Sequence, residues 1–385
     1  MSPRANWSYP TAVRYGAGRI GELADACESV GIRRPLLVTD PFLATQQMTV
    51  RALQHLKDAG LQPAMFSQIK SNPSDANIYD GLNILRGDQH DGVVAFGGGS
   101  SLDAGKVIAL MSGQTRPMWD FEDVGDSWTR ADPNGIVPII AIPTTAGTGS
   151  EVGRAGVITQ EATHTKKVIF HPAMMPKVAI CDPELTIGMP PLITAGTGLD
   201  ALAHCLEAYC ALFYHPMADG IAIEGTRLVK EFLARAYRDG NDIEARAQMM
   251  SAAAMGATAF QKGLGAIHAL SHPAGALCDT HHGLTNAVFM PYVLNFNRSA
   301  ISNKIERLAA YLGLKPQFGA FLDWVLALRA ELGVPHTLEG LDIPPERFVE
   351  MAAMAEKDPT ASGNPVKLDQ AAALRLYQDA LLGKI

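Results

Sequence analysis

The sequence lacks an excess of basic charge. Its 385 residues contain 32 lysines and arginines against 39 aspartates and glutamates, which gives a formal net charge of −7. Nucleic acids and anionic membranes bind basic surfaces. The charge balance therefore argues against both as partners.

Cysteine pairs are also missing. The chain has five cysteines, an odd number, and no two of them stand in a Cys-x-x-Cys arrangement. They are scattered at Cys27, Cys181, Cys205, Cys210 and Cys278. This pattern argues against a disulfide scaffold and favours a reduced, cytoplasmic setting.

Long apolar runs are absent as well. No uninterrupted run reaches membrane-spanning length, and the opening residues, Met-Ser-Pro-Arg-Ala-Asn-Trp, lack the apolar core of a signal peptide. We therefore expect neither a membrane segment nor a secretion signal. The chain contains no internal repeat, and its length allows two domains with separate cores.

Short apolar runs alternate with amphipathic segments in the first half of the chain. Strands and helices are predicted in turn at 35–40, 52–60, 64–66, 75–89 and 92–96. This β-α-β order predicts a parallel sheet with helices on both faces. We assign residues 1–187 to an α/β, Rossmann-like dinucleotide-binding domain.

A glycine-rich loop follows the last of these strands. Residues 97–101 read Gly-Gly-Gly-Ser-Ser, and a helical pattern comes next. Glycines let the backbone approach an anion, and N–H groups at a helix start point at it. Ser100 or Ser101 can cap the helix and also donate to a phosphate. A phosphate cradle is the favoured interpretation, and a plain tight turn is the alternative.

A second polar loop follows the apolar strand at 139–142. Residues 143–152 read Pro-Thr-Thr-Ala-Gly-Thr-Gly-Ser-Glu-Val. Hydroxyls and free amides at the carboxyl end of a strand suit contacts to sugar, diphosphate or amide groups. A solvated loop is the alternative for this segment alone, but two such loops on one sheet favour a dinucleotide crevice.

Asp40 ends an earlier predicted strand. An acid at this place binds ribose hydroxyls and repels a 2′-phosphate, which favours NAD over NADP. Since Asp40 precedes Pro41, it also fits the N-cap of a helix. The sequence leaves these two roles equal.

Strand patterns all but vanish after about residue 190. The segment that follows is rich in Ala, Leu and Met with helical charge spacing. We predict an all-helical domain over residues 188–385. The active site is expected in the cleft between the two domains.

Pairs of metal-binding residue types recur in this helical half. Asp200 and His204 stand four residues apart, so both side chains leave one apolar helical face. His268 and His272 repeat the spacing, and two further histidines stand at 281 and 282. One oxygen and three nitrogens suit Fe(II), Zn(II) or Co(II) and not Ca(II) or Mg(II). The alternative is that each pair satisfies itself within a core.

Together these motifs resemble the iron-containing, or group III, alcohol dehydrogenase family, over nearly the whole chain. The marks of the resemblance are residues 97–100 with Asp103 and Lys106, residues 143–148 with 150–152, residues 198–201 with His204, and the segment from His268 to Gly283. It implies a dehydroquinate synthase-like architecture, with an α/β nucleotide domain followed by an all-helical metal domain. It further implies hydride transfer between NAD and a small alcohol or aldehyde, in a homodimer or larger homo-oligomer.

The resemblance also assigns roles to individual residues. The metal ligands would be Asp200, His204, His268 and His282, binding Fe(II) or Zn(II). His272 would lie beside the substrate and could relay the alcohol proton, while His281 would be only a neighbour. The cofactor-binding residues would be Asp40, Asn72, Gly98, Gly99, Ser100, Ser101, Thr144, Thr145, Thr148 and Lys166.

The substrate is less sharply indicated. Residues 182–186, 203–205 and 260–265 are similar to those of 4-hydroxybutyrate dehydrogenases, which suggests a short ω-hydroxy acid or its semialdehyde. Arg154 could bind the carboxylate of such a substrate, or it could pair with a nearby acid. Rival functions are a polyol dehydrogenase of the glycerol type, a metal-independent maleylacetate reductase-like enzyme, and a non-catalytic nucleotide-binding protein.

Overall fold

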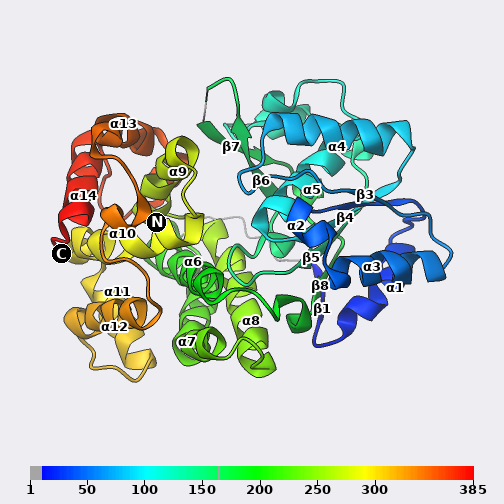
Figure 1. Cartoon of the computed structure of the whole chain (residues 1–385). Coiled ribbons are helices and arrows are strands. Elements are labelled where there is room, and N and C mark those ends of the chain that lie inside the picture. The colour runs from blue at the N-terminus through cyan, green and yellow to red at the C-terminus, as the bar shows by residue number, and fades with distance from the viewer. Residues whose placement is uncertain (1–10, 164) are drawn as a thin grey trace. The chain divides into compact units, whose positions relative to one another are not determined.

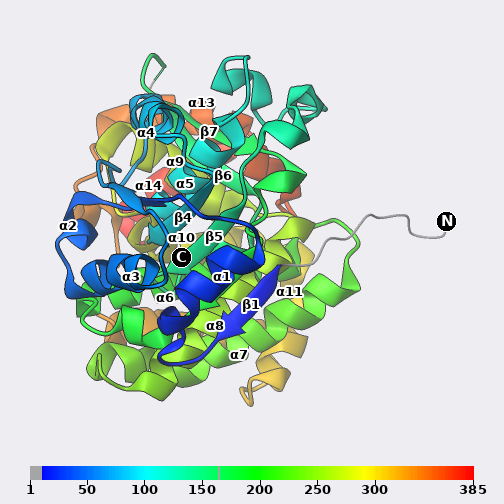
Figure 2. The ribbon, with the colours of Figure 1, turned by 90° about the vertical axis from the view of Figure 1, so that its right-hand side faces the viewer.

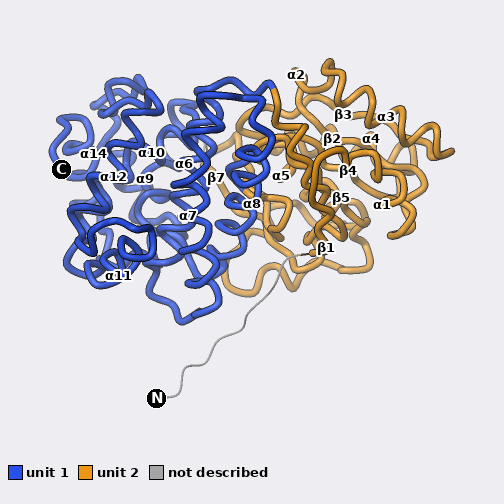
Figure 3. Tube along the Cα trace, turned by 90° about the horizontal axis from the view of Figure 1, so that it is seen from below, with its two compact units in different colours: residues 1–8, 146–148, 188–385 blue, residues 9–145, 149–187 orange. Residues whose placement is uncertain are grey.

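The computed structural model describes residues 11–163 and 165–385, which divide into two units (Figure 3). We call the first the α/β unit; its described residues are 11–145 and 149–187, apart from 164. The second, the helical unit, consists of residues 146–148 and 188–385.

The α/β unit is built on a parallel sheet of six strands. Their order across the sheet is β1-β8-β5-β4-β2-β3, and every neighbouring pair runs parallel. The strands are β1 (Ala12–Tyr15), β2 (Pro35–Val38), β3 (Ala64–Phe66), β4 (Gly92–Gly97), β5 (Ile139–Pro143) and β8 (Val178–Cys181). This confirms the parallel sheet that the sequence predicts.

Helices cover both faces of this sheet, as Figure 1 shows. Val93 and Ala95 of β4 pack on the face that α4 and α5 cover, whereas Val94 and Phe96 pack on the face of α1 and α3. A strand buried on both faces reads as a continuous apolar run, which explains its sequence. The helices are α1 (Leu23–Ser29), α2 (Pro41–Ala44), α3 (Gln47–Asp58), α4 (Asp75–Gly87) and α5 (Gly99–Met111).

The α/β unit also contains a small second sheet and several 3₁₀ helices. Strands β6 (Ala155–Gln160) and β7 (Thr165–Phe170) pair antiparallel and form a small separate sheet. Strand β1 lies at one edge of the main sheet, beside α1 (Figure 2). The single-turn 3₁₀ helices are Arg19–Glu22, Met118–Phe121, Ser127–Arg130, Pro133–Gly135, Ser150–Val152, Pro172–Met174 and Pro183–Thr186.

The helical unit contains helices and no strand among its described residues, as predicted. Its helices are α6 (Pro191–Cys210), α7 (Pro216–Arg238), α8 (Ile243–Ala259), α9 (Ala266–Cys278), α10 (His282–Phe296), α11 (Arg298–Tyr311), α12 (Phe318–Glu331), α13 (Phe348–Lys357) and α14 (Gln370–Leu382). Its 3₁₀ turns are Phe260–Lys262, Leu338–Leu341, Pro345–Arg347 and Pro359–Gly363. In the described part of the chain, no helix is both long and apolar enough to cross a membrane.

Helix α6 forms the centre of the helical unit. It packs against α7, α8 and α10, so its side chains are buried almost without interruption from Gly198 to Cys210. Polar side chains on such a helix cannot reach water and need partners inside the protein. Because Asp200 and His204 are buried on this helix, each needs a partner inside the protein.

Candidate metal centre and cofactor loops

Asp200 and His204 lie one turn apart on α6, as their spacing predicts. His204 Nε2 is 3.8 Å from Asp200 Oδ1, and both side chains are only 5% exposed. Burial lowers the pKa of His204 to about 4, although the Asp200 carboxylate opposes the shift. His204 is therefore neutral at neutral pH and keeps a ring lone pair for a metal ion.

His268 on α9 joins this pair. Its Nε2 is 3.8 Å from Asp200 Oδ1, and its ring stacks on that of His204 with centroids 4.7 Å apart. Asp200, His204 and His268 each offer one ligand atom, and these atoms lie within 4.8 Å of one another. A carboxylate and two imidazoles at this spacing fit a borderline divalent ion.

His282 approaches the same carboxylate from the start of α10. Its Nε2 lies 3.7 Å from Asp200 Oδ1, and its side chain is 30% exposed. The following Gly283 explains how α10 comes so near, because a Cβ there would lie 2.2 Å from the carbonyl oxygen of Gly196 on α6. The His-Gly motif thus has a packing reason in addition to any ligand role.

His281 has a different environment from its neighbour. Its Nδ1 accepts a hydrogen bond from the Leu284 N–H and caps α10. Burial lowers the pKa of His281, and its ring packs where a side chain on Gly196 would otherwise lie. The cap and this packing give His281 a structural role outside the metal cluster.

Sequence reasoning missed Asn286, which lies among the ligand atoms. Its Nδ2 is 2.8 Å from Asp200 Oδ1 and 3.2 Å from the Nε2 atoms of His268 and His282. It stands one turn after His282 on α10, and that spacing was the available signal.

Sequence reasoning also missed Glu207. It lies on α6 three residues after His204, and only 6% of it is exposed. Its Oε2 is 2.6 Å from His268 Nδ1. Burial acts to lower the pKa of His268, but the carboxylates of Glu207 and Asp200 outweigh it and the pKa is raised. An acid on a buried helical face was the signal in the sequence.

His272 lies beside the cluster but has its own carboxylate. Its Nδ1 is 2.8 Å from Asp358 Oδ2, and its ring stacks on that of His282 at 5.5 Å. Asp358 also accepts hydrogen bonds from the N–H and hydroxyl of Thr360. His268 and His272 lie one turn apart on α9, but their carboxylate partners differ: Glu207 for His268 and Asp358 for His272.

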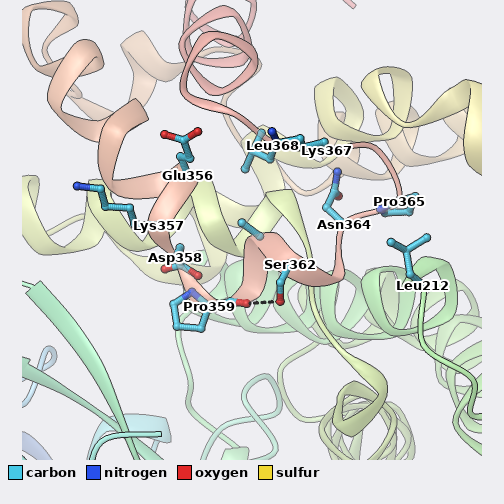
Figure 4. A pocket seen from close by; sticks show the side chains of 11 residues that line it. Leu212, Glu356, Lys357, Asp358, Pro359, Ser362, Asn364, Pro365, Lys367 and Leu368 are labelled. Carbon is cyan, nitrogen blue, oxygen red and sulfur yellow. Dashed lines mark hydrogen bonds between the residues drawn. The ribbon is translucent and has the colours of Figure 1, made fainter. Parts of the chain in front are cut away.

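A cavity of about 790 Å³ opens beside Asp358. Figure 4 shows it lined by the segment 356–368 and by Leu212, with Ser362 hydrogen-bonded to the Pro359 carbonyl. Lys357 and Lys367 contribute the cationic side chains of its lining. The cavity lies wholly within the helical unit.

The two predicted cofactor loops lie side by side at the carboxyl edge of the sheet. They follow β4 and β5, which pair in parallel with Gly97 opposite Pro143. The Thr144 N–H donates to the Gly97 carbonyl at 2.9 Å, and a Cβ on Gly98 would lie 3.4 Å from the Thr145 side chain. Neighbouring loops at this edge match the usual place for a nucleotide in an α/β sheet.

The start of α5 corrects one detail of the sequence analysis. The N-cap is Gly98, with no side-chain hydrogen bond, so neither Ser100 nor Ser101 caps the helix. Ser101 lies inside the first turn, and its buried Oγ has no hydrogen-bond partner among the described residues. The N–H groups of Gly99 and Ser100 remain at the N-terminal end of a helix, where an anion is favoured.

A buried network ties this helix to the second loop. Lys106 Nζ lies 3.1 Å from Asp103 Oδ1 and 3.1 Å from the Ser150 carbonyl oxygen. The Ser150 hydroxyl and the Val157 N–H both donate to Asp103. Asp103 and Lys106 therefore fix the relative position of the loops.

Asp40 follows β2 and caps α2. Its Oδ1 accepts a hydrogen bond from the Leu43 N–H at 2.8 Å, so the N-cap role is present. The adjoining Thr39 has a buried hydroxyl without a hydrogen-bond partner in the part of the chain that the structure describes. The cap holds one carboxylate oxygen of Asp40 in place.

The other predicted cofactor residues are more dispersed. Asn72 lies in the loop between β3 and α4, and Lys166 lies on β7 opposite Thr159. Thr148 belongs to the short segment of the helical unit in which Gly147 packs against Thr197. Arg154 lies with its guanidinium 5.2 Å from the Phe170 ring centroid.

Comparisons with known proteins identify the family. The model of the iron-containing alcohol dehydrogenases matches residues 10–183. The model of the C-terminal part of the same family matches residues 194–381. The chain belongs to the iron-containing alcohol dehydrogenase family. Membership makes it an oxidoreductase of the alcohol dehydrogenase class.

Relatives match this chain over most of their length. A 4-hydroxybutyrate dehydrogenase of Cupriavidus necator is 38% identical, covering 97% of this chain and 99% of the relative. An NAD-dependent methanol dehydrogenase of Bacillus methanolicus is 36% identical over 80% of each chain.

Solved structures of the family agree with the fold. A 1,3-propanediol oxidoreductase has a TM-score of 0.93 at 33% identity, covering 98% of this chain and 100% of the other. A sulfoacetaldehyde reductase from Bifidobacterium kashiwanohense, in complex with NAD⁺, has a TM-score of 0.87 at 29% identity and covers 98% of each chain.

Proposed function

We propose that this alcohol dehydrogenase uses a divalent metal held by Asp200, His204, His268 and His282, with Fe(II) preferred and Zn(II) as the alternative. The observation that carries the proposal is the buried cluster of Asp200, His204 and His268. His282 is included because its Nε2 lies 3.7 Å from the shared carboxylate. Three imidazoles and one carboxylate would suit Fe(II) or Zn(II).

A metal ion held here would supply Lewis acidity, and a nicotinamide cofactor would supply the redox chemistry. The protein's own residues position the alcohol and move its proton. His272 holds its Nδ1 against Asp358, which leaves Nε2 as the ring atom to take up a proton from the alcohol. We therefore assign His272 as the catalytic proton relay.

We assign cofactor binding to the loops of the α/β unit. Gly98, Gly99, Ser100 and Ser101 would hold the diphosphate, because glycines and a helix start admit an anion there. Thr144, Thr145 and Thr148 would line the cofactor with hydroxyls, and Asn72 and Lys166 would contact it. Asp40 would receive the ribose hydroxyls and favour NAD over NADP.

For the substrate, we propose a small primary alcohol or aldehyde, and within that class a short ω-hydroxy acid. The relative named 4-hydroxybutyrate dehydrogenase supports the acid, whereas those named for 1,3-propanediol and methanol support the wider class. A polyol is the nearest alternative. The full Asp and His set disfavours a metal-independent reductase or a non-catalytic protein. A homo-oligomer and a cytoplasmic location stay predictions.

The test is a substrate panel with metal-defined protein. Protein loaded with Fe(II) or Zn(II) should reduce short aldehydes with NADH, and chelated protein should not. Succinic semialdehyde should give a higher kcat/KM than butyraldehyde if the acid is the substrate. If no short alcohol or aldehyde turns over with either metal, the proposed function is wrong.

A further inference from the structure

Glu207 contacts the metal cluster without being one of its proposed ligands. We infer that Glu207 is a positioning residue that fixes the tautomer of His268 and seats helix α9 against α6, so that the Nε2 lone pair faces the metal position. The inference rests on the proposed metal site.

Both carboxylate oxygens of Glu207 accept hydrogen bonds from α9. Oε2 lies 2.6 Å from His268 Nδ1, and Oε1 accepts from the Ile267 N–H at 2.6 Å. The two donors are consecutive residues in the first turn of α9. One side chain from α6 therefore holds both the backbone and the imidazole of the helix that carries His268.

The helix start is arranged for this carboxylate. The N-cap of α9 is Gly265, which provides no side-chain cap. A Cβ at Gly265 would lie 3.1 Å from Glu207 Oε1 and 2.9 Å from Asn364 Oδ1. Glycine leaves room for these two caps from distant segments, and a negative charge at a helix N-terminus is favourable.

A variant of Asn364 can separate the two parts of the Glu207 role, which are supporting α9 and fixing the His268 tautomer. Asn364 Oδ1 accepts from the Ala266 N–H at 3.1 Å, so it caps the same helix end as Glu207. It also hydrogen-bonds with Asn297 and with the Val366 carbonyl. Within the described part of the chain, Asn364 thus supports α9 without a hydrogen bond to a proposed ligand histidine, which makes it a matched control.

The tautomer follows from the carboxylate. An ionised carboxylate is only an acceptor, so His268 Nδ1 must carry the proton. The lone pair of the neutral ring is then on Nε2, which lies 3.8 Å from Asp200 Oδ1. A carboxylate behind a metal-binding histidine fixes the ring and strengthens it as a ligand.

Glutamine is the sharpest substitution because it keeps the shape but only one acceptor. If its oxygen accepts from Ile267, its NH₂ faces His268 Nδ1 and favours the tautomer with the proton on Nε2. If its oxygen accepts from His268, its NH₂ faces the Ile267 N–H and two donors oppose each other. Neither orientation restores both hydrogen bonds.

The experiment measures metal affinity and His268 tautomer separately. Competition with a chromophoric chelator gives the Zn(II) affinity of wild type, Glu207→Gln and Asn364→Ala, and ¹⁵N NMR of histidine-labelled, metal-free protein gives the tautomer. Glu207→Gln should bind Zn(II) roughly 10- to 100-fold more weakly. Asn364→Ala should lower the melting temperature while its Zn(II) affinity stays close to that of wild type.

Two results would overturn the inference. One is a metal-free wild type in which His268 carries its proton on Nε2, which needs no variant to fold. The other is equal weakening of Zn(II) binding by Glu207→Gln and Asn364→Ala, because then only the helix position matters. A wild type that binds no metal but shows the Nδ1-protonated tautomer would refute the proposed function while supporting the role of Glu207 in fixing His268.

Discussion

The side-chain amide of Asn286 lies 2.8 Å from Asp200, with Nδ2 donating to Oδ1. The same nitrogen is 3.2 Å from the Nε2 atoms of both His268 and His282. Its Oδ1 is buried without a hydrogen-bond partner in the described part of the chain. The amide therefore satisfies acceptors whose lone pairs a metal ion would use.

Removing this amide should destabilise the metal-free protein more than the metal-loaded one. In Asn286→Ala the acceptors of Asp200, His268 and His282 lose a donor, which costs about 1–3 kcal/mol for buried groups. A bound cation would satisfy most of them again. Differential scanning fluorimetry should show a larger metal-induced rise in melting temperature for the variant than for wild type. An equal rise would contradict this role for Asn286.

Adjacent histidines at the start of α10 should differ sharply in their effect on metal binding. His282→Ala should lower metal content and activity together, because it removes a proposed ligand. His281→Ala should retain the metal and lose only stability, by roughly 0.5–2 kcal/mol for a lost N-cap. Elemental analysis with unfolding curves would separate the two. Retention of full metal content by His282→Ala would remove His282 from the ligand set.

Asp40 should set the preference for NAD, and its charge can be separated from its cap. Asn caps a helix about as well as Asp, so Asp40→Asn keeps the bond to Leu43 and removes the charge. Two unit charges about 4 Å apart in water repel by about 1 kcal/mol, so the NADP-to-NAD ratio of kcat/KM should rise roughly fivefold. Asp40→Gly should raise the ratio too, with some loss of stability. A wild type that already prefers NADP would show that Asp40 has no such role.

Glu151 should make the stability of the protein depend on pH near neutrality. Burial raises the pKa of Glu151 to about 7 from 4.5. Because the folded-state pKa is the higher one, the folded state binds the proton more tightly. This stability is present below the unfolded pKa and is lost as the pH rises through about 7.

Glu151→Gln removes this dependence because the amide does not ionise. Relative to the variant, wild type should lose about 2–3 kcal/mol between about pH 5 and pH 8. Melting temperatures of both proteins across this range would measure the difference. Parallel curves would mean that the Glu151 carboxyl titrates at its ordinary pKa.

The sequence predicts features that depend on local spacing, and tertiary contacts decide the rest. The i, i+4 spacing placed Asp200 and His204 on one face of α6, because helical geometry requires it. The same spacing could not distinguish His268 from His272, since their partners Glu207 and Asp358 come from other segments. Asn286 and Glu207 were missed because their partners lie on other helices: α6 and α9 for Asn286, and α9 for Glu207.

The cofactor loops show the same limit. The strand and the helix after the glycines were predicted correctly. The capping serines were not, because the helix begins at Gly99, with Gly98 as its N-cap. Asp40 does cap α2, so one of its two predicted roles is present. The choice between its roles was never exclusive, since a carboxylate has two oxygens.

The most direct test of this account is an anaerobic titration of metal-free protein with Fe(II), followed by NADH formation from a short primary alcohol. Activity should rise in proportion to bound metal and stop rising at about one ion per chain. Full activity of protein that elemental analysis shows to be free of metal would contradict the proposed role of the metal.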